Sequence, residues 1–102
     1  MRDNIKFHKW TCSLEVNRYM NGRTQLQLND SFDHEPIAVA TVNLPDIPLR
    51  HDEVAIKSYS ENTGMLECLM RYGVISSPLY TVRSGFVEIP VCKLLIDLNN
   101  LS

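Results

Sequence analysis

A hairpin signal in the first third of the chain constrains its fold more than any other feature. Apolar and polar residues alternate over positions 10–17 and again over positions 23–29, and Asn21 and Gly22 lie between the two runs. Alternation of this kind is typical of strands with one buried face, and an Asn-Gly pair between two such runs indicates an antiparallel hairpin. We therefore expect an antiparallel sheet with one apolar face.

The register of this hairpin follows from its apolar residues. A two-residue turn would place the apolar residues of the two strands on opposite faces, which a sheet with one buried face does not allow. A three-residue loop ending at Gly22 instead pairs Leu14 with Leu28 and Val16 with Leu26. We therefore predict this loop, with Gly22 in the left-handed conformation of a G1 bulge.

Further strands are expected in the remainder of the chain. Residues 37–44 are apolar on both faces, which is typical of a central strand, and the prolines at 45 and 48 end it. Residues 53–59 form a short fourth strand. Residues 79–82 and 86–89 are extended segments that form either one bulged strand or a tight hairpin. Residues 76–78 are expected to be a turn.

One principal helix is predicted over residues 61–72, with Ser60 as its N-cap. Gly73 is placed to end it, and Val74 to make the apolar contact of a Schellman motif. Gly64 falls inside the first turn, where glycine costs ~1 kcal/mol relative to alanine. Close packing of another backbone is the preferred explanation for Gly64. Pro90 is expected to open a short final helical turn. The apolar stripe of the helix comprises Met65, Leu66, Leu69 and Met70.

These elements predict an α+β fold: a mostly antiparallel sheet of about five strands with one principal helix packed on one face. The helix stripe would cover the apolar residues of the hairpin. A strongly curled, barrel-like sheet with the helix as a plug is the alternative. The 102 residues are expected to form a single domain, residues 1–102, in which residues 1–7 and 97–102 are loose.

Composition limits the classes of function. The chain is 44% hydrophobic and 22% charged, and its net charge is −2. This balance indicates neither a polybasic nucleic-acid binder nor a strongly acidic nucleic-acid mimic. No apolar run approaches the length of a membrane span or a signal peptide. We therefore expect a soluble, cytoplasmic protein without a membrane partner.

Residues that commonly carry chemistry are scattered along the chain. Cysteines 12, 68 and 92 are odd in number and widely spaced, which favours buried free thiols over a disulfide or a zinc site. His8, His34 and His51 show no ligand spacing. No nucleophile and base lie in a known motif. The sequence therefore predicts no catalytic residue, no metal and no cofactor, and a protein that is not an enzyme.

The second half of the chain resembles a known family. Residues 53–66 (EVAIKSYSENTGML), 73–75 (GVI) and 84–92 (SGFVEIPVC), with 40–44 (ATVNL), resemble a family of small uncharacterised proteins carried by bacteriophages, plasmids and conjugative elements. The similarity lies mainly in residues 40–95 and brings no known site residue. It implies an accessory protein of a mobile element in the cytoplasm of a bacterial host cell.

Accessory proteins of this kind are often inhibitors of host defence. The resemblance therefore implies a non-enzymatic interaction protein, of the anti-CRISPR or antirestriction type, that acts by binding a protein partner. A small nucleic-acid-binding or regulatory module is the alternative. A contiguous Lys/Arg patch would favour the alternative, and an acidic or polar–aromatic patch would favour the inhibitor. The sequence carries no signal for an oligomeric state.

Two acidic loops are the candidate partner contacts. They lie at residues 29–35 and 45–53, and a meander of strands would place them at opposite ends of the sheet. Acidic groups there would steer a basic partner surface, although loops are commonly polar without any such role. The polar face of the hairpin is an alternative contact surface. The six candidate residues are Asp30, Asp33, Glu35, Asp46, Asp52 and Glu53.

Overall fold

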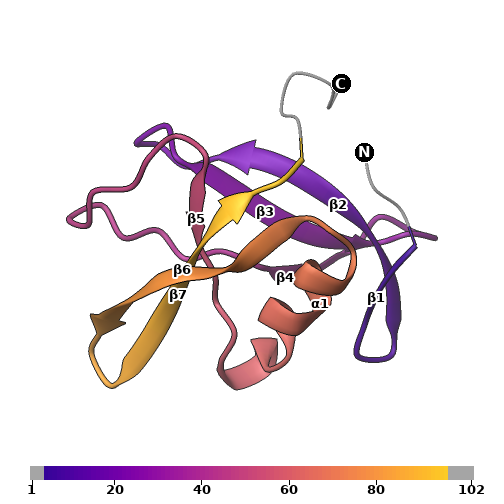
Figure 1. The fold of residues 1–102 in the computed structure, drawn as a ribbon. Coiled ribbons are helices and arrows are strands. Elements are labelled where there is room, and N and C mark those ends of the chain that lie inside the picture. The colour runs from indigo at the N-terminus through magenta and orange to yellow at the C-terminus, as the bar shows by residue number, and fades with distance from the viewer. Residues whose placement is uncertain (1–3, 97–102) are drawn as a thin grey trace.

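A computed structural model describes residues 4–96, which form two antiparallel sheets, one short helix and a 3₁₀ turn (Figure 1). The first sheet has the order β1-β2-β3-β4, with bounds Ile5–Phe7, Trp10–Arg18, Thr24–Asp30 and Pro36–Val39. The second has the order β5-β7-β6, with bounds Glu53–Ala55, Val87–Leu94 and Ile75–Ser84. The 3₁₀ turn is Ser60–Asn62 and the helix, α1, is Met65–Arg71.

The α+β class, the antiparallel strands and the single α-helix are therefore confirmed for the described residues, whereas the prediction of one sheet of about five strands is wrong. The chain instead forms seven strands in two sheets. The sheets are linked where Thr41 forms an isolated bridge with Ile56. Ala40 lies just before this bridge, and its backbone N–H donates to Leu26 of the first sheet at 2.7 Å.

The predicted hairpin register is confirmed. Leu14 pairs with Leu28 and Val16 with Leu26. The Tyr19 N–H donates to the Arg23 carbonyl at 2.8 Å, so the loop has three residues. Its last residue, Gly22, has φ 87°, the left-handed conformation that the G1 bulge requires.

The N-terminal residues were expected to be loose, and for β1 this is wrong. Ile5 and Phe7 are buried, and they pair with Cys12 and Trp10 of β2. Three residues are too few for alternation to stand out in a sequence, although Ile-Lys-Phe has the pattern. Residues 97–102, also expected to be loose, lie outside the described residues.

The predicted central strand over residues 37–44 is also wrong. β4 ends at Val39 and is an edge strand of the first sheet. Its apolar pattern continues because the chain then crosses to the second sheet, where the Val42 N–H donates to the Ala55 carbonyl at 3.0 Å. Val42 and Leu44 pack on that sheet, whereas Ile37 and Ala38 pack in the main core, so the two halves of this segment belong to different apolar clusters.

The helix begins later than predicted. Ser60 has φ 54° and lies in the 3₁₀ turn, and Gly64, with φ 92°, precedes the first helical residue, Met65. A Cβ on Gly64 would meet nothing within 4 Å, so its left-handed backbone and not close packing accounts for this glycine. The cap is supplied by Ser58, whose Oγ accepts the Leu66 N–H at 3.0 Å.

The predicted end of the helix is confirmed. The Val74 N–H donates to the Leu69 carbonyl at 2.9 Å, and the Gly73 N–H donates to the Met70 carbonyl at 3.1 Å. Gly73 has φ 71°, and Val74 is fully buried. These two bonds and the left-handed glycine are a Schellman motif.

The last two strands form a tight hairpin, one of the two alternatives expected for this region. β6 and β7 pair from Ile75 to Leu94, and the predicted turn at residues 76–78 is instead an irregular part of β6. Pro90 lies inside β7, so the predicted final helical turn is wrong. The Pro90 carbonyl accepts the Ile56 N–H, and Ile56 lies one residue beyond the end of β5. Proline has no N–H to donate, but at this position β5 has already ended, so the ladder between β5 and β7 does not need one.

The main core lies between the first sheet, α1 and one face of the second sheet. Met65, Cys68 and Leu69 of α1 share it with Leu14 and the other apolar residues of the hairpin. The helix stripe is therefore rotated from the predicted one, because Met70 is 38% exposed. All three cysteines are buried and free, as the sequence predicts.

Candidate functional site

A second apolar cluster lies on the other face of the β5-β7-β6 sheet. Side chains alternate along β7, so that Cys92 and Leu94 enter the main core while Ile89 and Val91 point the opposite way. Ile89, Val91 and Ala55 are the only buried members of the second cluster among the described residues. Its partly buried members are Val42, Leu44, Leu49, Tyr59, Val82 and Val87.

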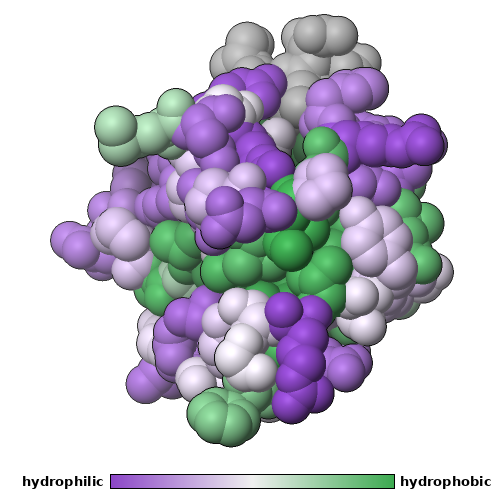
Figure 2. All heavy atoms as spheres, turned by 90° about the vertical axis from the view of Figure 1, so that its left-hand side faces the viewer, coloured by the Kyte–Doolittle hydropathy of each residue, from purple (hydrophilic) through white to green (hydrophobic). Residues whose placement is uncertain are grey.

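The surface above this cluster is apolar and hollowed. Figure 1 shows the segment before β5 and the end of the β6–β7 hairpin on the same side of the molecule. Figure 2 views that side and shows a continuous hydrophobic area in its middle, bordered by hydrophilic side chains. An exposed apolar area with a polar rim is typical of surfaces that bind other proteins.

An irregular segment covers part of the cluster. Residues 42–49 cross the sheet face, and the Arg23 guanidinium donates to the carbonyls of Leu44 and Ile47. Asn21 of the same β2–β3 loop donates to the Asn43 side chain at 3.1 Å. The β2–β3 hairpin tip therefore holds this segment, called here the strap (residues 42–49), against the second sheet.

Two hollows open along the strap. The larger, about 630 Å³, lies between the end of the strap and β6, and its apolar lining includes Leu49, Leu79 and Tyr80. The smaller, about 200 Å³, lies where Leu44 and Ile47 face the end of β6. Both hollows lie along β6, so a ligand or side chain bound in one hollow would lie next to the other hollow.

Charged groups surround the larger hollow. The Glu53 carboxylate accepts the Arg50 N–H at 2.9 Å and the Tyr80 hydroxyl at 3.1 Å. Burial and this carboxylate raise the pKa of Tyr80, so its hydroxyl remains a donor. The side chains of Arg50 and Lys93 line the same hollow and form no ion pair within residues 4–96.

An aromatic side chain projects from the hairpin beside the cluster. Ser84 pairs with Val87, so Gly85 and Phe86 form a two-residue turn. Gly85 has φ 61° and Phe86 does not have a positive φ, as in a type II′ turn. Phe86 is 100% exposed. The position after the glycine in this turn keeps the ring away from the sheet, where it is available to a partner.

The six acidic residues predicted as partner contacts fall into two groups. Asp46 lines the smaller hollow, and Asp52 and Glu53 line the larger, so these three border the second cluster. Asp30 accepts the backbone N–H of Phe32 at 2.8 Å, and Asp33 accepts that of Glu35 at 3.0 Å.

The second group therefore builds its own turn at the far end of β3 from the strap, because Arg23 precedes β3 and Asp30 ends it (Figure 1). The structure does not bring the two groups together. The meander of one sheet from which the sequence predicts opposite positions is not present, because β4 and β5 belong to different sheets. The two groups form separate acidic borders, and only one of them adjoins the apolar surface.

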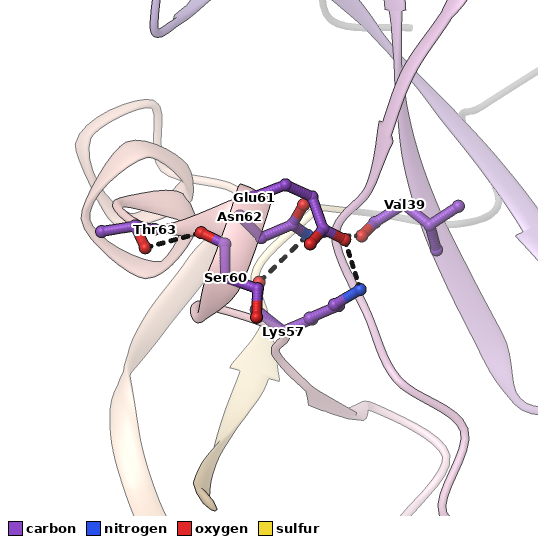
Figure 3. Close-up of polar contacts among 6 residues, drawn as sticks. All are labelled: Val39, Lys57, Ser60, Glu61, Asn62 and Thr63. Carbon is purple, nitrogen blue, oxygen red and sulfur yellow. Dashed lines mark hydrogen bonds and ion pairs between the residues drawn. The ribbon is translucent and has the colours of Figure 1, made fainter.

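The polar segment before α1 has a structural role (Figure 3). Asn62 is buried, and its Nδ2 donates to the carbonyls of Val39 at 2.7 Å and Lys57 at 3.2 Å. Lys57 and Glu61 form an ion pair of 2.6 Å, which raises the pKa of Lys57 and lowers that of Glu61. These contacts tie the 3₁₀ turn to β4, which accounts for the polar residues that the sequence places here.

Within residues 4–96 the thiols and histidines form no metal-binding group, although Cys12 and Cys68 lie close enough to interact electrostatically. Burial raises the pKa of Cys12 and of Cys92 to about 11, and it raises that of Cys68 as well. His8 has its Nε2 2.7 Å from the Thr63 carbonyl and stacks on Phe7. No three His, Cys, Asp or Glu side chains in the described part of the chain are placed to hold one metal ion.

Comparisons with protein-family models, with curated proteins and with solved structures find no match to this chain. Over residues 4–96, neither helix is long and apolar enough to cross a bilayer.

Sequence reasoning missed the apolar surface itself. The sequence predicts Val82 and Val87 only as parts of extended segments and Leu49 only as part of an acidic loop, and it places Arg23 only on the polar face of the hairpin. One signal was available: Ile47 and Leu49 flank Pro48 in a loop, residues 45–53, that the sequence predicts to be irregular. An irregular segment this apolar needs a surface to cover or a partner.

Proposed function

We propose that this protein is a non-enzymatic binding module whose contact surface is the second apolar cluster together with Phe86. The observation that carries the proposal is the incomplete cover of that cluster: three members are buried and six are partly exposed. Apolar side chains left partly open on a sheet face, next to a fully exposed aromatic ring and inside a polar rim, are typical of a protein-binding surface.

The mixture of charges around the surface supports a protein partner over a nucleic acid. Arg50 and Lys93 line the larger hollow, but Asp52 and Glu53 line it too. A nucleic-acid site would gather cations along the phosphate backbone. A polar rim of both signs around an apolar centre is instead typical of protein interfaces.

For the identity of the partner, the resemblance of residues 40–95 to proteins of mobile elements supports a component of host defence. In this proposal the protein acts in the cytoplasm of a bacterial cell and inhibits a CRISPR or restriction system by occupying one of its proteins. A regulatory module that contacts nucleic acid directly is the alternative.

Two phenylalanines provide the matched test. Phe86 and Phe32 are both at hairpin or loop tips, and are 100% and 93% exposed, but Phe86 directly precedes Val87 of the second cluster and Phe32 lies in the β3–β4 loop. The native chain, Phe86→Ala and Phe32→Ala would each be used to capture proteins from a bacterial host and identify them by mass. Removing an aromatic anchor costs about 2 kcal/mol, or about thirtyfold in Kd.

We expect the native chain and Phe32→Ala to retain the same partner and Phe86→Ala to lose it. The captured partner, once purified, would be titrated with all three proteins. Interference by a CRISPR or restriction system in cells expressing each variant would then test the host-defence proposal. Equal binding by Phe86→Ala and Phe32→Ala would contradict the proposed surface, and capture of nucleic acid alone would favour the regulatory module.

A further inference from the structure

The outer edge of β6 is a second surface with a defined chemistry. The order β5-β7-β6 leaves no strand of residues 4–96 beyond β6. From Tyr80 to Ser84 its pairing with β7 is regular, whereas a register shift lies between Pro78 and Tyr80. The regular part is thus a five-residue strand, bounded by an irregularity at one end and by the Gly85–Phe86 turn at the other.

The backbone groups that face outward on this edge can be assigned. Ser84 and Val87 flank a two-residue turn, so they exchange backbone hydrogen bonds with each other, as do Val82 and Ile89 two residues further on. The intervening residues, Thr81 and Arg83, therefore direct their N–H and C=O groups away from β7.

The direction of the Pro90 carbonyl on β7 supports this assignment of the outward backbone groups of β6. Pro90 pairs with Thr81, and the Pro90 carbonyl points toward Ile56 on the side away from β6. Four strong backbone groups, from Thr81 and Arg83, are consequently presented in a row. An unpaired row of this kind pairs with another extended chain.

We propose that the occupant of this edge is a second copy of this chain, paired antiparallel to it about a two-fold axis at Val82. This register places Val82 opposite Val82, Thr81 opposite Arg83 and Tyr80 opposite Ser84. It uses all five regular residues, since Val82 is their midpoint. Each outward Thr81 exchanges two backbone hydrogen bonds with Arg83 of the second copy.

Charge complementarity supports the second copy as the occupant. Arg83 and Glu88 are directly opposite each other on β6 and β7, but they form no ion pair among the described residues. The Glu88 carboxylate instead accepts the Thr81 hydroxyl at 3.4 Å. In the paired edge, Arg83 of the second copy lies across from Thr81 on the same face, and its long side chain reaches this carboxylate.

The symmetry repeats that contact, so two ion pairs form between the copies, and no like charges face each other directly. A strand of partner protein would need to supply its own cation at the position opposite Thr81. A second copy already carries one there, because the antiparallel register brings Arg83 to that position.

The dimer has a consequence for binding, which rests on the proposed function. Side chains paired across an antiparallel ladder point to the same face, so the two sheets join into one of six strands with both second apolar clusters on one side. The two surfaces would then form a single area about twice as large. A two-fold symmetric or repeated partner surface would fit it.

Sedimentation equilibrium of the full native chain over a wide concentration range tests the dimer. A five-residue ladder is small, so we expect reversible association that weakens as salt rises. Arg83→Glu places a carboxylate beside Glu88 of the second copy and should weaken association at least about tenfold. Arg83→Glu combined with Glu88→Arg should restore it.

Thr81→Pro is the second variant, because it removes an N–H that makes no bond to β7. It eliminates two hydrogen bonds from the dimer, so association should again weaken about tenfold or more. Thermal melting of each variant at low concentration would establish that the monomer is folded. Thr81→Ser keeps the N–H and the hydroxyl and should associate like the native chain.

A native chain that stays monomeric at the highest concentration would overturn the proposal, as would equal association by Thr81→Pro. A monomeric chain that loses its captured partner on Thr81→Pro would assign the edge to that partner instead of a second copy. The two proposals fail separately: a monomer that still needs Phe86 to bind its partner refutes only the dimer, and a dimer whose partner binding ignores Phe86 refutes only the binding surface.

Discussion

The two apolar clusters of this protein differ in how they are covered. The main core is enclosed on its several sides by the first sheet, α1 and the second sheet, and Leu14, Leu26 and Leu69 in it are at most 1% exposed. The second cluster has regular structure on one side only. The strap covers the other side incompletely, and most of its members remain partly exposed.

This difference separates the main core, which stabilises the fold, from the second cluster, which leaves apolar side chains accessible to a partner. Apolar area left in water forgoes about 25 cal/mol per Å² of stabilisation. Both clusters are built from the same residue types and share strand β7, so the incomplete cover is not a matter of composition. It follows from the covering element, since the strap is one irregular segment, whereas the main core is covered by a helix and two sheets.

A charge introduced into the main core should lower the free energy of unfolding much more than a charge introduced into the second cluster. Leu69 is fully buried in the main core, and Leu69→Asp should unfold the protein, because an unpaired buried carboxylate costs several kcal/mol. Leu49 is only partly buried in the second cluster, and Leu49→Asp should cost about 1 kcal/mol. Urea unfolding followed by far-UV circular dichroism would measure both. Equal losses would show that the second cluster is as structural as the first.

The thiols allow the main core to be tested by pH. Cys12 and Cys92 both belong to it, and burial raises the pKa of each from 9.0 to about 11. The folded state therefore favours the protonated thiols. Their stabilisation is complete below pH 9.0 and is lost as the pH rises through about 11, by about 2–3 kcal/mol for each thiol.

The measurement is the free energy of unfolding as a function of alkaline pH. Other groups titrate in this range, so the native chain is compared with Cys92→Ala, which should lose stability less steeply between pH 9 and 11 because one of the three buried thiols is gone. If the free energy of unfolding fell equally with pH in the two proteins, the raised pKa of Cys92 would be contradicted. The second cluster contains no cysteine, so binding through it should be insensitive to thiol reagents that leave the protein folded.

The parts of the fold that local signals determine were predictable from the sequence. The β2–β3 register followed from Leu14, Val16, Leu26 and Leu28, because a shift by one residue would expose a whole strand. The Schellman motif at Gly73 was equally local. In both cases a few neighbouring residues carry the complete pattern.

The errors arose where distant segments meet. Residues 37–44 looked like one buried strand because their first and second halves pack in different apolar clusters, which no local pattern distinguishes. Pro90 looked like the start of a helix because its tolerance in β7 depends on where β5 ends. The second cluster was missed for the same reason: its members come from residues 42–59 and from β6 and β7, and partial exposure appears only when these segments are assembled.

Loosening the strap should affect the second cluster alone. Arg23→Met keeps much of the side-chain volume but removes the donors to the carbonyls of Leu44 and Ile47, at a cost of about 1–2 kcal/mol. Hydrogen exchange should become faster for amides in residues 44–50 and remain unchanged for those of α1. Equal acceleration in both regions would mean that the strap is part of the main folding unit. Arg18→Met is the control, because this neighbouring arginine donates to the Gly22 carbonyl and not to the strap.

The smallest effect is expected from neutralising the two groups of acidic residues. It is an effect on the rate of association with a partner, and it compares the surroundings of the second cluster with the far end of β3. Asp46 and Asp52 border the second cluster, whereas Asp30, Asp33 and Glu35 lie at the far end of β3. Asn keeps the side-chain acceptors of the turn at Asp30 and Asp33, so both sets of substitutions should leave the fold intact. Charges at the rim of an interface act mainly on the association rate.

We therefore expect Asp46→Asn with Asp52→Asn to slow association with a basic partner about twofold to threefold and to flatten its salt dependence. The set Asp30→Asn, Asp33→Asn and Glu35→Gln should have a smaller effect, because these residues lie at the far end of the seven-residue strand β3, and salt screens exposed charges beyond a Debye length of about 8 Å. Stopped-flow association at several salt concentrations measures both. A larger effect from the distant set would move the contact to the β3–β4 loop, and no effect from either would leave the apolar surface to act without electrostatic steering.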